Sequence, residues 1–124
     1  MTFILQRQNA PIFYPVTIPV VLDGGAVRTH KFDFQFQRVS RSRLNELQRA
    51  SEALRDSGVD SLEKDVDYLM EVACGWRGVT DPEGHAVDFN RDNVHQLLDA
   101  YPNAAGEIVK AFFEASLGGA KTKN

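Results

Sequence analysis

The segment from Cys74 to Val94 contains the single cysteine and the only tryptophan of the chain, together with several side chains of types that bind metal ions. These potential ligands are Asp81, Glu83, His85, Asp88 and Asp92. Four of them match the first, third, fifth and twelfth positions of a calcium-binding loop, but that loop requires glycine at its sixth position, where Ala86 stands. Zinc would require paired cysteine or histidine ligands at short spacing, which Cys74 and His85 lack. The pattern therefore favours a solvated loop, and we expect no metal.

Nucleophilic catalysis would require Cys74 to act with His85 or His95. Neither a nucleophile-elbow motif nor a cysteine–histidine family signature surrounds Cys74. A lone cysteine near the end of an apolar helix is typical of a small core residue. Gly24 and Gly25 suit a hairpin turn better than a phosphate-binding loop. We therefore expect no catalytic residue and no cofactor, and we predict that the protein is not an enzyme.

A basic cluster offers a different chemistry, namely contact with phosphate groups. Its members are Arg38, Arg41, Arg43, Arg49 and Arg55. Glu46 precedes Arg49 and Glu52 precedes Arg55 by three residues, a helical spacing at which opposite charges pair. The pattern favours an ordinary solvated helix face. A small nucleic-acid-binding or regulatory protein that uses this arginine-rich helix is the alternative function.

The composition is that of a single globular domain, with 124 residues of which 43% are hydrophobic and 25% are charged. The 14 Lys and Arg residues and 17 Asp and Glu residues give a net charge of −3, which provides no general attraction to nucleic acid or anionic membranes. No apolar run is long enough to span a bilayer, and the N-terminus lacks the pattern of a secretion signal. A single cysteine excludes an internal disulfide and fits a reducing cytoplasm.

The N-terminal third of the chain predicts a β-hairpin. Residues 1–14 lack periodicity, and we expect them to form a flexible arm. Residues 16–22 are rich in β-branched side chains, and the following Asp-Gly-Gly at 23–25 supplies a turn. Pro19 has no backbone N–H to donate, which places this first strand at an edge of the sheet.

The second strand carries a period of two. Phe32, Phe34 and Phe36 alternate with polar residues, so three aromatic rings share one face. Because an isolated hairpin is only marginally stable, we expect these rings to pack beneath the helices that follow.

Four helices are predicted from apolar residues that recur every three or four positions. Their stripes are Leu44, Leu47, Ala50 and Leu54; Leu62, Val66, Leu69, Met70 and Ala73; Val94, Leu97, Leu98 and Tyr101; and Ala105, Ile108, Phe112 and Ala115. Ser40 or Ser42 is expected to cap the first helix and Gly58 to end it. The second helix is expected to end near Gly75, and Pro102 stops the third.

A hairpin followed by about four helices is an α+β fold. We expect one domain over residues 15–117 and a flexible C-terminal tail over residues 118–124.

The segment that joins the second and third helices has a structural explanation. Trp76 is expected to anchor it on the core with its indole N–H hydrogen-bonded. Residues 81–84, Asp-Pro-Glu-Gly, suit a type I turn. Asn90 is the expected N-cap of the third helix, and Phe89 and Val94 occupy the positions of a hydrophobic staple.

Residues 75–115, GWRGVTDPEGHAVDFNRDNVHQLLDAYPNAAGEIVKAFFEA, resemble the phage tail assembly chaperones of long-tailed bacteriophages and their prophages. The matching positions are Gly75-Trp76, Gly78-Val79, Asp81, Gly84, Val87, Phe89, Leu97-Leu98 and Tyr101-Pro102. The preceding HKFDFQFQRVSRSRLNEL is similar too, so the resemblance covers roughly residues 15–117. The chain departs from the pattern at Asn90-Arg91, where serine and an acidic residue are expected, and at His85-Ala86.

The resemblance implies a non-catalytic chaperone that binds the long, helical, aggregation-prone tape-measure protein and promotes assembly of the tail tube around it. It also implies contact with the major tail-tube protein, action in the host bacterial cytoplasm and absence from the mature virion. In many such phages a programmed frameshift makes a longer form of the chaperone, which would be a further partner.

Two sets of residues follow from this interpretation. Val109, Phe113 and Leu117 are expected to bind the partner, because they extend the apolar surface of the fourth helix beyond its core stripe. The family signature is expected to serve structure rather than chemistry, and it comprises Trp76, Gly78, Asp81, Gly84, Phe89, Asn90, Tyr101 and Pro102.

Overall fold

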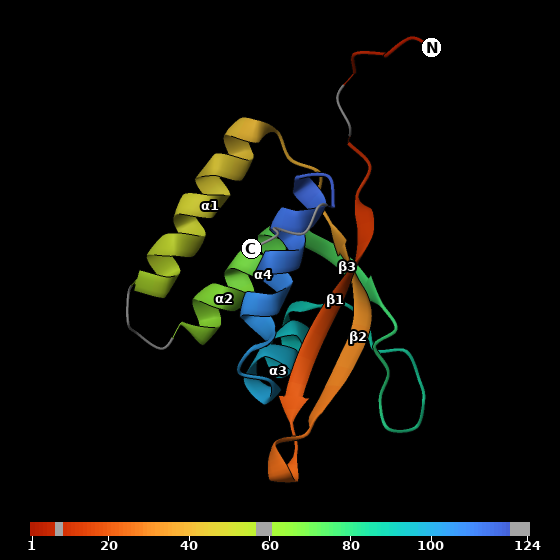
Figure 1. Cartoon of the computed structure of the whole chain (residues 1–124), viewed down its shortest axis with the longest axis vertical. Coiled ribbons are helices and arrows are strands. Elements are labelled where there is room, and N and C mark those ends of the chain that lie inside the picture. The colour runs from red at the N-terminus through yellow and green to blue at the C-terminus, as the bar shows by residue number, and fades with distance from the viewer. Residues whose placement is uncertain (7–8, 57–60, 120–124) are drawn as a thin grey trace.

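A computed structural model describes residues 1–6, 9–56 and 61–119 of the chain (Figure 1). The described residues form three strands and four helices in the order β1 (Ile12–Val21), β2 (Val27–Phe36), α1 (Arg41–Asp56), α2 (Leu62–Val72), β3 (Ala73–Arg77), α3 (Arg91–Ala100) and α4 (Ala104–Ser116). The predicted α+β class, with an N-terminal hairpin followed by helices, is confirmed. No helix among the described residues is long and apolar enough to cross a membrane.

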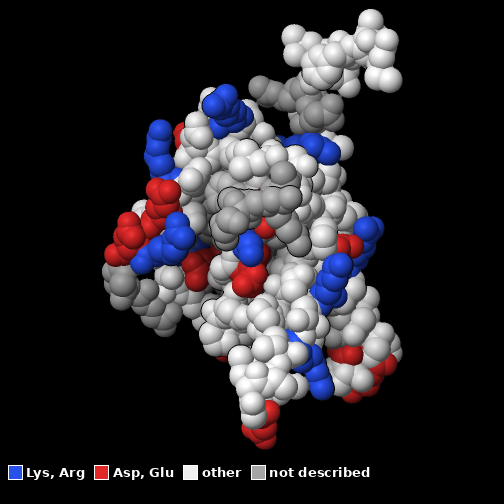
Figure 2. Space-filling model, viewed as in Figure 1, with Lys and Arg blue, Asp and Glu red and all other residues white. Residues whose placement is uncertain are grey.

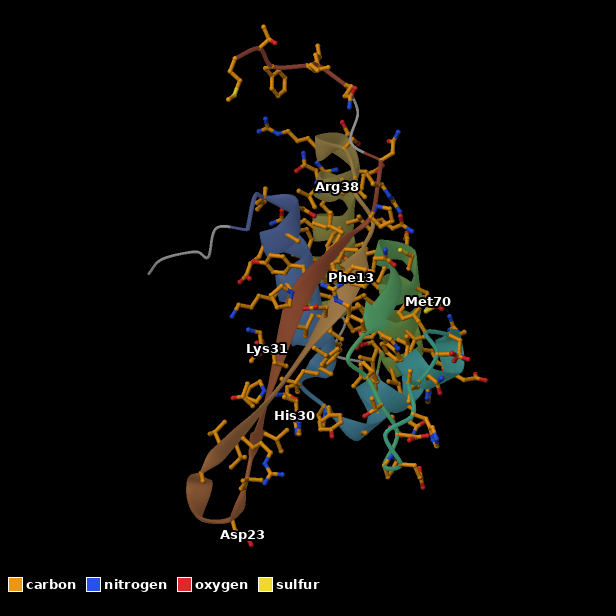
Figure 3. The ribbon with its side chains drawn as sticks, turned by 90° about the vertical axis from the view of Figure 1, so that its right-hand side faces the viewer. Phe13, Asp23, His30, Lys31, Arg38 and Met70 are labelled. Atoms are coloured by element: carbon orange, nitrogen blue, oxygen red, sulfur yellow. The ribbon has the colours of Figure 1, made fainter. Side chains whose placement is uncertain are left out.

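The hairpin pairs β1 with β2 in antiparallel register, from Ile12 opposite Phe36 to Val21 opposite Val27. The strand therefore includes three residues, 12–14, that we expected in the N-terminal arm. A short 3-10 turn (Asp23–Gly25) joins the strands, and both of its glycines have positive φ angles, 78° and 86°. Asp23 marks the far end of the hairpin, which projects beyond the helices (Figure 3).

The β1 edge of the sheet is protected by prolines. The strand order is β1-β2-β3, so β1 is an edge strand, as Pro19 predicted. The carbonyl oxygen of Pro19 accepts a hydrogen bond of 2.8 Å from Asn103 Nδ2, so its backbone polar groups face away from β2. Pro15 lies four residues earlier and faces the same way, because strand orientation repeats every two residues. Two donors are thus missing from the open edge, which hinders pairing with another chain.

The third strand was not predicted. The second helix ends at Val72 rather than near Gly75, and β3 then pairs with β2, with Phe34 opposite Trp76 and Gln35 opposite Gly75. A Cβ atom on Gly75 would lie 2.7 Å from the Gln35 Oε1 atom, so glycine is required where the two strands meet. A five-residue strand that contains a glycine has too little β-propensity to be distinguished from the end of an apolar helix.

The core lies between one face of the sheet and the helices α2, α3 and α4. Phe34 and Phe36 are 0% and 1% exposed and Phe32 is partly buried, so the aromatic face predicted for β2 is confirmed. Val16 and Ile18 extend the same face on β1. The other buried residues are Leu47, Val66, Tyr68, Leu69, Val72, Ala73, Val94, Leu98, Ala104, Ile108, Ala111 and Phe112.

The opposite face of the sheet is exposed. The Arg77 guanidinium lies 4.0 Å from the centroid of the Phe13 ring, and its Nε atom lies 2.8 Å from an Asp33 carboxylate oxygen. Figure 3 shows this face in front of the helices, with Phe13 and Lys31 labelled on its strands.

Helix α1 stands apart from the rest of the fold on one side of the molecule (Figure 1). Ser40 Oγ accepts a hydrogen bond of 3.2 Å from the Arg43 N–H, which confirms one of the two predicted caps. All residues of α1 are described, and Leu47 is the one that is buried. Ala50, predicted in the apolar stripe, is exposed, because it lines an open hollow between α1 and α2. The predicted end at Gly58 lies outside the described residues.

Candidate functional site

Trp76 fixes the segment that follows β3. Its indole Nε1–H donates a hydrogen bond of 2.7 Å to the Val87 carbonyl oxygen, as expected from the sequence. The indole ring also makes edge-to-face contacts with Phe34 and Phe89, at centroid distances of 5.8 and 5.2 Å. Such contacts add to the stability gained from burial of the rings. Trp76 therefore connects the sheet, the loop and the start of α3.

The acidic loop is organised as a turn. The Gly84 N–H donates to the Asp81 carbonyl oxygen at 3.0 Å, so the expected four-residue turn is present, and Gly84 has a φ angle of 87°. Asp81 Oδ1 accepts hydrogen bonds of 2.9 Å from the backbone N–H groups of Glu83 and His85. An aspartate that caps its own turn in this way needs no ligand to explain it.

Three of the five potential metal ligands lie close together. Donor atoms of Asp81, Glu83 and His85 fall within 4.8 Å of one another. Two of the three side chains are exposed, and exposed acidic groups of this kind are common without a metal. The Asp81 carboxylate is already used by the turn, and its second oxygen lies 3.4 Å from His85 Nδ1. The grouping is therefore explained by the turn itself.

Asn90 begins α3 as predicted. Its side-chain Oδ1 accepts a hydrogen bond of 2.8 Å from the Asn93 N–H. Phe89 packs against the core and Val94 is fully buried, in agreement with the staple positions. The cap satisfies one of the N–H groups that a helix start leaves without a partner.

We expect Asn90→Ala to lower the free energy of unfolding by about 1 kcal/mol, because it removes a side-chain cap. Ser61→Ala is the matched control, since Ser61 occupies the N-cap of α2 without a side-chain cap hydrogen bond. Urea unfolding of the two variants should separate them. Equal losses of stability would show that the Asn90 side chain is not the stabilising element.

Cys74 is not the core residue that we expected. It is exposed on β3, because Ala73 points into the core and side chains alternate along a strand. Partial burial raises the pKa of the thiol, which disfavours the reactive thiolate. His85 is engaged with Asp81, and His95 Nε2 lies 3.1 Å from a Glu63 carboxylate oxygen. The two histidines considered for catalysis are therefore held by other residues.

The arginine-rich helix face carries mixed charge. Glu46 forms an ion pair with Arg43 at 3.3 Å rather than with the expected Arg49. The expected pair of Glu52 with Arg55 is absent, although all residues of α1 are described. The long exposed side chains allow pairing in either direction along the helix, which spacing alone does not fix. Arg38 Nε donates a hydrogen bond of 3.0 Å to the Ala10 carbonyl oxygen. Figure 2 shows acidic residues beside basic ones over this part of the surface.

A groove lies between α1 and α4, and α2 contributes to its floor; its α4 wall is largely apolar and its α1 wall is largely polar. We call it the α1–α4 groove, and its volume is about 500 Å³. The lining residues are Gln48, Ser51, Leu54, Arg55, Ser61, Asp65, Tyr68, Leu69, Pro102, Ala105, Gly106, Val109, Lys110, Phe113 and Leu117. The three residues predicted to bind a partner, Val109, Phe113 and Leu117, all lie on its α4 wall.

Helix α4 has two apolar faces. One is buried in the core through Ala104, Ile108, Ala111 and Phe112. The other lies in the groove, where Val109 and Phe113 are half-buried and Leu117 is 67% exposed. Ala105, which we expected in the core stripe, lines the groove instead, and Ala104 takes its place. A helix that is apolar on a second face is typical of a surface that another element covers.

The α1 wall is held by a small number of contacts. The Tyr68 hydroxyl on α2 donates a buried hydrogen bond of 2.7 Å to the Leu47 carbonyl oxygen. Arg43 on α1 forms an ion pair with Glu71 on α2. Burial, followed by the nearby Glu71 carboxylate, raises the pKa of Tyr68 to about 12. The Tyr68 hydrogen bond, the Arg43–Glu71 ion pair and the buried Leu47 side chain together hold α1 against the rest of the fold.

We expect Tyr68→Phe to lower the free energy of unfolding by about 1 kcal/mol, because a buried hydrogen bond from the Tyr68 hydroxyl to the Leu47 carbonyl is lost. The folded-state pKa of Tyr68, about 12, lies above the ordinary 10.0, so the contribution of this hydroxyl to stability is complete below pH 10 and is lost as pH rises towards 12. The variant should lack this part of the alkaline loss. Urea unfolding at pH 7 measures the difference in stability between the two proteins, and urea unfolding at pH 11 measures how much stability each loses in alkali. Equal alkaline losses in the wild type and the variant would contradict the assignment of this loss to Tyr68.

The described residues form a small α+β domain in which part of an apolar helix face lies open in a groove, and the chemically diverse loop is a turn. The family model described as phage tail assembly chaperone matches residues 1–124, the whole chain, so the protein belongs to that family. No curated protein and no solved structure matches the chain significantly.

Proposed function

We propose that the chain binds the tape-measure protein through the α1–α4 groove, keeps it soluble and promotes assembly of the tail tube around it. Membership of the phage tail assembly chaperone family gives the general role. The observation that carries the specific partner site is the second apolar face of α4, formed by Val109, Phe113 and Leu117. The proposed mechanism is non-catalytic: reversible cover of apolar surface on a partner that would otherwise aggregate.

The dimensions of the groove suit a helical segment. The 13 residues of α4, Ala104–Ser116, extend for about 20 Å at 1.5 Å per residue. A partner helix of roughly 13 residues would follow the whole helix. Its apolar stripe would contact Val109, Phe113 and Leu117, which is the helix-in-groove mode of recognition. Complete burial of a leucine-sized side chain contributes about 1.5–3 kcal/mol, so a few such contacts are enough for useful affinity.

The remaining parts of the proposal follow from the same role. The domain acts in the host bacterial cytoplasm and does not remain in the mature virion. The major tail-tube protein and a frameshift-extended form of the chain are further partners. The alternative, nucleic-acid binding by α1, gains no support from a helix on which Arg43 already pairs with Glu46 and Glu71.

Co-expression with the tape-measure protein from the same tail gene cluster tests the proposed function. We expect the tape-measure protein to be insoluble alone, to become soluble with the chaperone, and to co-purify with it. An insoluble tape-measure protein in the presence of folded chaperone would refute the proposal. Binding of the chaperone to RNA or DNA at low salt would instead support the alternative.

A further inference from the structure

Gly106 is the third residue of α4, and nothing within the described protein requires glycine there. It is not among the glycines with a positive φ angle, and a Cβ atom at this position would meet no heavy atom within 4 Å. Gly75 and Gly78 differ, because a Cβ atom at Gly75 would lie 2.7 Å from Gln35 Oε1 and Gly78 has a φ angle of 83°. Glycine in a helix destabilises the chain relative to alanine. Glycine at position 106 therefore lowers the stability of the free protein, and this residue lines the groove.

The neighbours of Gly106 extend this small surface along the groove. Ala105 is adjacent, and Val109 and Phe113 continue the α4 wall at helical spacing. The distance between two packed helices depends on the side chains at their point of contact, so the closest approach is possible where these are smallest. A partner helix can thus bring its backbone nearest to α4 at Gly106 and place larger side chains towards Leu117.

The rim of the groove carries one cation on each of its two helical walls, and Asp65 of α2 adds a carboxylate to the lining. Arg55 on α1 and Lys110 on α4 line the groove, and neither forms an ion pair with any described residue. By contrast, Arg43, Arg77 and Arg91 are all paired. Unpaired cations beside an apolar surface favour a partner with acidic side chains at the matching positions.

The charge of the rim also argues against occupation by the ends of a second copy of the chain. Residues 1–22 contain apolar side chains but no aspartate or glutamate, and the segment after Glu114 contains two lysines and no acidic side chain. Neither segment therefore supplies a carboxylate side chain to Arg55 or Lys110.

We infer that the α1–α4 groove selects an amphipathic helix of the tape-measure protein that has a small residue where it crosses Gly106 and acidic residues on the flanks of its apolar face. This inference rests on the proposed function and specifies the partner segment. Gly106 sets how close the helix approaches, and Arg55 and Lys110 set its flanking charge.

Overlapping 20-residue peptides of the tape-measure protein, tested for binding by fluorescence anisotropy, identify the segment. We expect the tightest peptide to become helical on binding and to carry flanking acidic residues. Replacement of those residues by their amides should weaken binding about tenfold. A peptide of residues 1–9 of the chaperone that bound more tightly than every tape-measure peptide would overturn the inference in favour of self-association.

Variants at Gly106 separate stability from recognition. Gly106→Ala should raise the melting temperature by about 2–4 °C while it weakens peptide binding at least tenfold, and Gly106→Leu should abolish binding. Glu107→Ala is the control on the same helix, because Glu107 does not line the groove. If Gly106 had only a structural role, Gly106→Ala would change stability without weakening peptide binding.

Charge reversal tests the rim. Arg55→Glu and Lys110→Glu should each weaken binding of the acidic peptide about tenfold, whereas Arg49→Glu, outside the groove on α1, should change it less than twofold. If Leu117→Asp abolishes binding but the Gly106 and charge variants bind normally, the inference is overturned while the proposed function stands. If the Leu117 variant also binds normally, the groove itself is refuted as the partner site.

Discussion

Leu117→Asp is expected to abolish co-purification of the tape-measure protein while the chaperone stays folded. Leu117 is 67% exposed at the end of the groove, so the charged side chain is solvated in the free protein and costs little stability. In the complex the carboxylate would be buried against an apolar helix face. We expect affinity to fall at least 100-fold, which corresponds to about 3 kcal/mol.

Val21→Asp is the matched control for this experiment. Val21 is 73% exposed, but it lies on the projecting hairpin rather than in the groove. Both variants should keep the wild-type melting temperature within a few degrees, as measured by circular dichroism. If neither variant co-purified with the tape-measure protein, the partner would bind exposed apolar residues in general rather than the groove. Loss with Val21→Asp alone would move it to the hairpin.

Phe34→Ala is expected to have the largest effect on the fold. Phe34 is fully buried, and its ring packs with Phe32, Phe36, Trp76 and Phe89 at centroid distances of 5.7 to 6.1 Å. Truncation leaves a cavity at the point where the sheet meets the loop, and it should lower the free energy of unfolding by about 3–5 kcal/mol. Native domains of this size are stable by only about 5–15 kcal/mol, so the variant should be close to unfolding at 37 °C.

The control for Phe34→Ala is Phe13→Ala on the other face of the same hairpin. Phe13 is 40% exposed and contacts Arg77 through its ring, so its truncation should cost about 1 kcal/mol or less. Guanidinium unfolding measures both. Similar losses would mean that the two faces of the sheet contribute equally, which would contradict the one-sided core.

The relation between the groove and the acidic loop changes how the signature residues are understood. Trp76, Asp81 and Asn90 fix a connection that brings α3, and through Pro102 the start of α4, to their positions. Tyr101 ends α3 with a hydrogen bond of 3.1 Å from its N–H to the Leu97 carbonyl oxygen. The reactive-looking segment thus positions α4, whose outer face is the proposed partner site.

The sequence by itself determined the local features whose causes lie within a few residues. The alternation of Phe32, Phe34 and Phe36 identified the buried face of β2, and Asn90 identified the start of α3. The paired glycines at 24–25 identified the hairpin turn. Period, capping and turn chemistry act over short separations, so the printed residues are sufficient to predict them.

Only the tertiary structure decided which surfaces are covered. Strand β3 exists because β2 offers it an edge, and that pairing joins residues about 40 positions apart. Cys74 is exposed because β3 replaces the helix end that periodicity predicted. Val109, Phe113 and Leu117 were identified as apolar from the sequence, but their arrangement on one wall of a groove depends on where α1 is held by Tyr68 and Leu47. Apolar residues at helical spacing predict that one face of a helix is buried. The packing of elements that are distant in the sequence decides which apolar face stays open to a partner.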